Sequence, residues 1–179
     1  MRTCFFILLI SLIFSGCGTK NSPITHFDAP DFTLSSLTDL EVSLESLKGE
    51  VVVIHFGTSW CPFCRVEDPH LQALHELYKD RGVQTLVVNV GEEDAVASAW
   101  KKEAGFSFPM LMDREGIVTA RYAPADVHPD LPRHEVMIAS NLIIDRQGNV
   151  RFMSLLDTND FDAQLVALRT ELDKILAES

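Results

Sequence analysis

Residues 55–69 read HFGTSWCPFCRVEDP and directly follow the apolar run Val51–Ile54. A short, continuously apolar run is typical of a strand that is buried on both faces. Beyond the two cysteines, apolar side chains recur at helical spacing from Leu71 to Tyr78. The stretch therefore predicts a buried strand, a short loop and a helix that begins near Cys61.

The pair Cys61 and Cys64 has the spacing of a redox dithiol. A thiolate is favoured over a thiol at the N-terminus of a helix, where the peptide dipoles present their positive end. Cys61 is therefore the expected nucleophile, and Cys64, one helical turn later, is placed to resolve a mixed disulfide. Pro62 suits the first helical turn because its missing N–H is not needed there.

Two metal-based interpretations of this pair are weaker. A zinc site needs two further ligands, and the sequence has no second pair of cysteines at this spacing. Haem attachment needs a histidine directly after the second cysteine, where Arg65 stands. Redox chemistry is therefore favoured over metal binding and over the packing of two free thiols.

The beginning of the chain predicts export. In residues 1–16 a positive charge precedes an apolar run that is short for a membrane-spanning helix, which is typical of a signal peptide. Residues 15–17 (Ser-Gly-Cys) resemble a bacterial lipobox, in which the cysteine is lipidated; the alternative is a plain signal peptide beside an ordinary Cys17. We expect residues 17–27 to form the lipidated cysteine with a flexible tether, and residues 28–179 to form the domain.

Cysteine usage and charge agree with this location. The chain has four cysteines. If Cys4 is removed with the leader and Cys17 carries the lipid, Cys61 and Cys64 remain as one pair. In an oxidising compartment a reduced pair needs an upstream electron donor. The formal net charge of −11 argues against nucleic acid as a partner. We therefore expect an extracytoplasmic bacterial lipoprotein that is held to a membrane through its lipid.

The remaining periodicity predicts a mixed sheet that is covered on both faces. The expected elements are a hairpin over 32–44, a strand over 83–90, a helix over 94–104, a second hairpin from 138–144 and 149–155, and a terminal amphipathic helix with apolar positions from Phe161 to Leu176.

Several short motifs together resemble one known family, the TlpA-like thiol-disulfide oxidoreductases of the thioredoxin superfamily. The motifs are Ala29-Pro30-Asp31-Phe32, Leu47-Lys48-Gly49, Ser59-Trp60-Cys61-Pro62-Phe63-Cys64-Arg65 with Glu67 and Pro69, Phe108-Pro109, and Leu142-Ile143-Ile144-Asp145 with Gly148. The resemblance implies a thioredoxin-like α/β fold with an N-terminal β-hairpin extension. It also implies an exported enzyme without a cofactor that reduces disulfides of other exported proteins.

The resemblance assigns supporting roles around the dithiol. It implies that Trp60 packs beside the active site, that Pro62 and Phe63 tune the dithiol, and that Pro69 kinks the active-site helix. For Glu67 the alternatives are an electrostatic role and a solvated position on the helix.

His55 stands six residues before Cys61, where thioredoxin relatives carry a buried Asp or Asn. An imidazole there can relay the proton when Cys64 attacks. The alternative is a neutral, hydrogen-bonded histidine of the core.

The position of the family's cis-proline is occupied by Ala139, six residues before Asp145. A cis peptide before alanine costs about 2.5–4 kcal/mol, so a trans peptide is expected. In relatives this proline shapes the substrate groove and keeps metals away from the thiols. Its replacement opens the alternative of a copper-binding metallochaperone.

That copper site would consist of Cys61, Cys64 and a histidine from the long loop that precedes Ala139. Thiolate and imidazole are suitable copper ligands, and His134, or less favourably His128, would be the third ligand. The alternative for each histidine is an ordinary surface position. A third and weaker hypothesis is peroxide reduction, because Thr58 stands three residues before Cys61 as in peroxiredoxins; the proline expected before it is replaced by Ile54.

Overall fold

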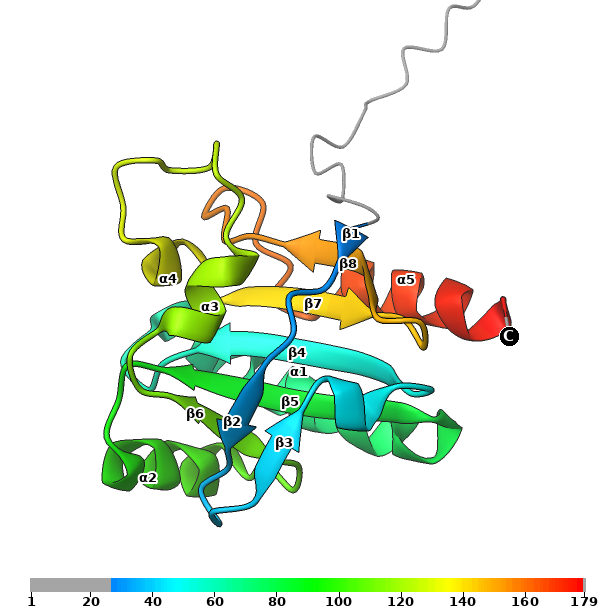
Figure 1. Cartoon of the computed structure of the whole chain (residues 1–179), viewed down its shortest axis with the longest axis horizontal. Helices are drawn as coiled ribbons and strands as arrows, with labels where there is room; N and C mark the ends of the chain where they lie inside the picture. The colour runs from blue at the N-terminus through cyan, green and yellow to red at the C-terminus, as the bar shows by residue number, and fades with distance from the viewer. Residues whose placement is uncertain (1–26, 179) are drawn as a thin grey trace, which may run out of the picture.

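The structure is a computed structural model that describes residues 27–178. Its centre is a six-stranded sheet in which β4, β5 and β6 run parallel and the other neighbours are antiparallel (Figure 1). In spatial order the strands are β1 (Phe27–Asp28), β8 (Asn149–Ser154), β7 (Ser140–Ile144), β4 (Val51–Gly57), β5 (Val83–Val90) and β6 (Met110–Asp113). The predicted leader and Cys17 lie outside the described residues, and Phe27, the last residue of the predicted tether, lies opposite Val150.

Helices and a hairpin cover the sheet. The α-helices are α1 (Pro62–Tyr78), α2 (Asp94–Ala104), α3 (Ile117–Tyr122), α4 (Arg133–Val136) and α5 (Val166–Ala177), with short 3-10 helices at Glu45–Leu47 and Lys79–Arg81. A separate two-stranded sheet is formed by β2 (Thr33–Ser35) and β3 (Glu41–Ser43). Within residues 27–178, none of the helices has the length and apolarity that crossing a bilayer requires.

Two hydrophobic cores lie on opposite faces of the sheet. Successive side chains of a strand point to opposite faces, so Val51 and Val53 of β4 join one core and Val52 and Ile54 join the other. The first core is closed by α1, α2 and α5, and the second by the β2–β3 hairpin and α3. His55 follows the alternation of Val51 and Val53, which places it beneath α1.

These observations confirm the predicted thioredoxin-like α/β fold, its mixed sheet and its N-terminal hairpin. The helix α2 has the predicted bounds, because Gly105 adopts the left-handed conformation that ends it. The prediction missed β6, α3 and α4, which have at most six residues each.

Two predicted boundaries were wrong for local reasons. The terminal helix begins at Val166 and not near Phe161, because Leu165 has φ of 54° and Asp162 accepts hydrogen bonds from the first N–H groups of the helix. The strand β7 begins at Ser140 and not at residue 138, because Ala139 has φ of 63°.

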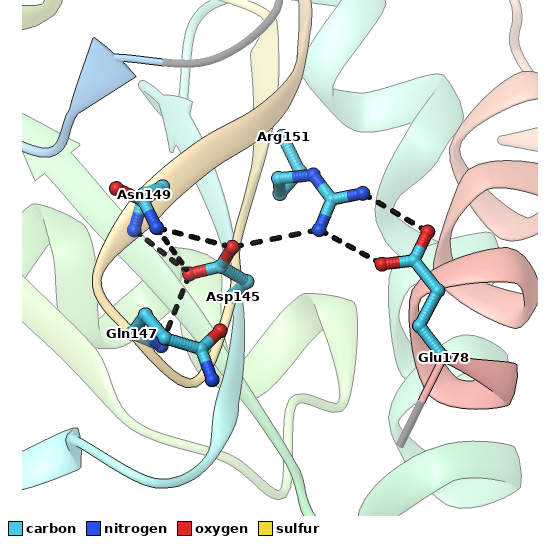
Figure 2. Close-up of polar contacts among 5 residues, drawn as sticks. All are labelled: Asp145, Gln147, Asn149, Arg151 and Glu178. Carbon is cyan, nitrogen blue, oxygen red and sulfur yellow. Dashed lines mark hydrogen bonds and ion pairs between the residues drawn. The ribbon is translucent and has the colours of Figure 1, made fainter.

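The β7–β8 turn is tied to the end of α5 by a polar network (Figure 2). Asp145 Oδ1 accepts hydrogen bonds from the backbone N–H groups of Gln147 (3.0 Å) and Asn149 (2.9 Å). Arg151 Nη1 lies 3.5 Å from Asp145 Oδ2, and the guanidinium donates two 3.0 Å hydrogen bonds to Glu178. The network fixes the turn and docks the C-terminal helix on the sheet.

Candidate active site

Cys61 lies where β4 has ended and α1 begins. It is the N-cap residue of α1 with extended backbone angles, and Pro62 occupies the first helical turn. Cys61 Sγ accepts a hydrogen bond from the backbone N–H of Cys64 at 3.4 Å. The first N–H groups of a helix have no partner within the helix, so they are available to a sulfur anion at this position.

The two thiols differ in acidity. Both are free cysteines, and their exposed fractions are 3% for Cys61 and 0% for Cys64. A hydrogen bond from the Cys64 thiol, helped by the N–H groups of Cys64 and Phe63 and opposed by burial, lowers the pKa of Cys61 to about 6. The same thiol contact, together with burial, raises the pKa of Cys64. This asymmetry favours Cys61 as the attacking thiolate.

The loop before Cys61 is held by Glu92, a residue that the sequence reasoning missed. Glu92 accepts hydrogen bonds from the backbone N–H of Ser59 (2.8 Å), from its hydroxyl (2.5 Å) and from Asn89 Nδ2 (2.5 Å). A signal was available, because Glu92 follows the end of β5 and the carboxyl ends of parallel strands meet at one edge of a sheet.

The residues beside the cysteines differ in their exposure. Trp60, which the resemblance places beside the active site, is 67% exposed, so its indole is largely open to solvent. Pro62 is exposed as well. Phe63 is half-buried, and its ring contacts Phe161 at a centroid distance of 5.0 Å. Trp60 and Pro62 therefore present an apolar surface next to Cys61.

Beneath the cysteines, three buried polar side chains from α1, β4 and β7 meet. Asn141 Nδ2 donates a hydrogen bond to Glu67 Oε1 (3.0 Å), and Asn141 Oδ1 lies 3.0 Å from His55 Nδ1. Glu67 Oε2 is 3.3 Å from the same ring nitrogen but has no hydrogen-bond partner among residues 27–178. Glu67 is 2% exposed, so its interpretation as a solvated helix residue is wrong.

Burial changes the protonation of this cluster. It raises the pKa of Glu67 to about 8, although the hydrogen bond from Asn141 opposes the rise. It lowers the pKa of His55 to about 4, again against the effect of Asn141. At neutral pH His55 is therefore a neutral imidazole, and Glu67 is close to the pH at which it exchanges its proton.

Gly57 makes room for the His55 ring. A Cβ atom at residue 57 would lie 2.6 Å from His55 Nε2 and 2.9 Å from the Trp100 ring. Any larger residue would therefore displace the imidazole. Trp100 is itself fixed by a hydrogen bond from its Nε1 to Asp68 Oδ2 at 3.0 Å.

Ala139 packs in the same core cluster as the two cysteines. Its N–H donates to the carbonyl of Phe56 at 2.9 Å, and it is 3% exposed. Its peptide is trans, as is every peptide among the described residues. The backbone here reaches its turn through the positive φ of Ala139 instead of through proline.

The structure does not bring His134 to the cysteines. His134 packs over Gly116, where a Cβ atom would lie 2.8 Å from the histidine Cβ. No group of three His, Cys, Asp or Glu side chains suited to a metal is found in the described part of the chain. Copper binding by Cys61, Cys64 and His134 stays a prediction, and it requires a rearrangement of the loop.

A cavity of about 230 Å³ lies next to the buried polar cluster, and neither cysteine is among its lining residues. Glu67, Ala139 and Asn141 line it, together with His128 from the long loop and Phe161. The loop wall is fixed by Arg133, which donates to the carbonyls of residues 124, 127 and 128. His128 of this loop thus lines the cavity together with Glu67.

Comparisons with known proteins agree with this geometry. The model of the AhpC/TSA family matches residues 26–153. The thiol-disulfide oxidoreductase ResA of Geobacillus kaustophilus is 30% identical over 156 residues, which cover 84% of this chain and 83% of the relative. ResA of Bacillus subtilis is 31% identical over 158 residues, with coverages of 84% and 80%.

Two solved structures show the same fold. A thiol:disulfide interchange protein of the thioredoxin family from Chlorobium tepidum has a TM-score of 0.64 at 21% identity and covers 88% of this chain and 99% of its own. A secreted disulfide oxidoreductase of Mycobacterium tuberculosis has a TM-score of 0.61 at 20% identity, with coverages of 83% and 96%. The chain belongs to the AhpC/TSA family, and within it to the TlpA-like thiol-disulfide oxidoreductases of the thioredoxin superfamily.

Proposed function

We propose that this chain is a lipid-anchored, extracytoplasmic reductase of disulfides in other exported proteins. The observation that carries the proposal is the asymmetry of the two thiols. Cys61 lies at the N-cap of α1 with a lowered pKa, whereas Cys64 is fully buried one turn later with a raised pKa. The anchor and the export rest on the sequence of residues 1–17, and the reducing direction rests on the family resemblance.

In the first step the Cys61 thiolate attacks one sulfur of the substrate disulfide. The substrate S–S bond breaks, a mixed disulfide with Cys61 forms, and the departing substrate thiolate takes a proton from solvent. The exposed Trp60 and Pro62 offer the apolar surface against which the substrate chain lies. No base is needed for this step, because Cys61 is already ionised above a pH of about 6.

In the second step Cys64 loses its proton and attacks the Cys61 sulfur. The mixed disulfide breaks, the second substrate thiolate leaves and is protonated, and the enzyme is left with a Cys61–Cys64 disulfide. Two electrons have then passed to the substrate. An upstream thiol donor restores the dithiol by the reverse exchange.

Glu67 is the proton acceptor that this second step requires. It lies three residues after Cys64 on α1, a spacing that places both side chains on one face of the helix. The Cys61 thiolate raises the pKa of Glu67 through its charge, and this charge disappears when the mixed disulfide forms. Glu67 therefore ionises more readily at the moment when Cys64 has to lose its proton, while neutral His55 packs beneath it.

Trapping of mixed disulfides tests the proposal. A Cys64→Ser variant should retain exported proteins as disulfides on Cys61, because the resolving thiol is missing. The matched Cys61→Ser variant should retain none. Non-reducing electrophoresis followed by mass spectrometry measures both, and equal trapping by the two variants would contradict the assigned roles.

A further inference from the structure

Asn141 joins the two titratable side chains beneath the dithiol. The antiparallel pairing of β4 and β7 places it directly opposite His55, and α1 lays Glu67 against it. Asn141 is 2% exposed, and each polar atom of its amide faces one partner at 3.0 Å. Its side chain is therefore held from both sides in a single orientation.

The chemistry of an amide determines which atoms donate and which accept in these two hydrogen bonds. An amide nitrogen only donates hydrogen bonds, and an amide oxygen only accepts them. Because Asn141 Nδ2 donates to Glu67, its Oδ1 is the atom that faces His55 Nδ1. His55 Nδ1 must then carry the ring proton. The other ring nitrogen, Nε2, is a buried acceptor with no hydrogen-bond partner in the described chain.

We propose that Asn141 is a positioning residue for the second thiol step. By holding Glu67 at Oε1 and fixing His55 as the Nδ1-protonated tautomer, it leaves Glu67 Oε2 as the atom that takes the proton of Cys64. The inference rests on the proposed function and adds to it a residue that does not titrate. The proton moves from Cys64 Sγ to Glu67 Oε2, and the sulfur anion then attacks Cys61 as described above.

The charges around Glu67 show why the amide is needed. Asp162 before α5, the Cys61 thiolate and Asp68 on α1 all disfavour a second negative charge. The imidazole beneath is neutral at neutral pH and offers no positive charge. The Asn141 N–H favours the carboxylate, so its loss would raise the pKa of Glu67 further and leave less of the carboxylate available at neutral pH to accept a proton.

The tautomer of His55 tests the inference without any substitution. Long-range ¹H–¹⁵N correlation spectra of the reduced full chain, labelled in its histidines, distinguish a protonated from an unprotonated ring nitrogen. We expect Nδ1 to be protonated and Nε2 unprotonated at pH 7. A ring that is protonated at Nε2 would overturn the inference, because Asn141 would then donate to His55 and not to Glu67.

A variant tests the effect on the reaction. Asn141→Leu keeps the size of the side chain and removes both polar atoms, and Ser140→Ala, on the same buried strand but facing the other way, is the matched control. The protein is loaded at Cys61 with a thionitrobenzoate group, and the release of this group by Cys64 is followed against pH. We expect Asn141→Leu to slow the release about tenfold at pH 7, the size of one hydrogen bond to a charged group, and to shift the midpoint to higher pH.

The outcomes separate this inference from the proposed function. If Glu67→Gln removes the pH dependence of the release but Asn141→Leu behaves as Ser140→Ala does, Glu67 accepts the proton without help and the inference is wrong. If Glu67→Gln also leaves the profile unchanged, the proton acceptor itself has been misassigned. If Asn141→Leu does not fold, the tautomer of His55 in the unsubstituted protein decides whether the inference holds.

Discussion

The surroundings of two buried carboxylates, Glu67 and Asp145, shift their pKa values in opposite directions. Asp145 is 7% exposed, and burial would raise its pKa, but hydrogen bonds from Asn149, Gln147 and Arg151 hold the pKa below its usual value (Figure 2). Glu67 is 2% exposed and accepts one hydrogen bond, so burial raises its pKa to about 8.

The comparison separates a structural acid from a reactive one. A carboxylate whose hydrogen bonds are complete stays ionised and stabilises the fold. A carboxylate whose second oxygen has no donor is costly when ionised, and it can therefore exchange a proton near neutral pH. Glu67 lies beside the dithiol, whereas Asp145 lies at the turn that docks α5. The carboxylate with incomplete hydrogen bonding is thus the one at the active site, and the carboxylate with complete hydrogen bonding is the one at a structural turn.

The largest expected effect is the loss of activity on changing Glu67 to Gln. General acid–base catalysis contributes about 10²–10⁴-fold, so we expect turnover of a protein disulfide at pH 7 to fall by about 100-fold. Stability at pH 7 should not decrease, because glutamine keeps the Asn141 contact and adds no buried charge. Reductase kinetics and urea unfolding measure the two quantities. If Glu67→Gln lost as much stability as an Asp145 variant, Glu67 would be a structural carboxylate and the contrast with Asp145 would be wrong.

Asp145→Ala should show the opposite behaviour. It leaves the N–H groups of Gln147 and Asn149 without their acceptor, and we expect unfolding free energy to fall by about 2–3 kcal/mol with turnover unchanged. Glu178→Gln, at a 55% exposed side chain of the same network, is the milder control and should cost under about 1 kcal/mol. Equal losses for both variants would mean that the turn is not the stabilising part of the network.

The dependence of stability on pH should also separate the two carboxylates. Glu67 has a folded pKa above its unfolded value, so its contribution is complete below pH 4.5 and is lost as the pH rises toward 8. Relative to the wild type, the unfolding free energy of Glu67→Gln should therefore rise across this window, by about 5 kcal/mol at most. Asp145 has the opposite sign, and its contribution is lost as the pH falls through its lowered pKa. Denaturant unfolding at pH 5, 6.5 and 8 measures these slopes, and parallel curves for wild type and Glu67→Gln would contradict the raised pKa.

The sequence predicted those parts of the molecule whose signals are local. The apolar run before the cysteines gave β4, and Asp94 together with Gly105 bounded α2, because strand burial and helix termination depend on neighbouring residues. The short elements β6, α3 and α4 were missed, since four to six residues are too few to show a period.

The partners of the active site were not predictable in the same way. His55 and Asn141 are 86 residues apart, and Ser59 and Glu92 are 33 apart, so only the strand order brings each pair together. The sequence placed Glu67 on the helix but not its burial, because burial there depends on β7 and on the segment before α5. Pairs formed across the sheet carry no local pattern.

The central claim is that Cys61 is the attacking thiolate and Cys64 the shielded partner, and alkylation of the reduced protein tests it most directly. Mass spectrometry after brief exposure to iodoacetamide, from pH 4 to pH 10, gives the rate of modification at each cysteine. We expect Cys61 to react first with a midpoint near pH 6 and Cys64 to stay unmodified in the folded protein. Faster modification of Cys64, or a midpoint for Cys61 at the ordinary thiol value of about 8.5, would contradict the account.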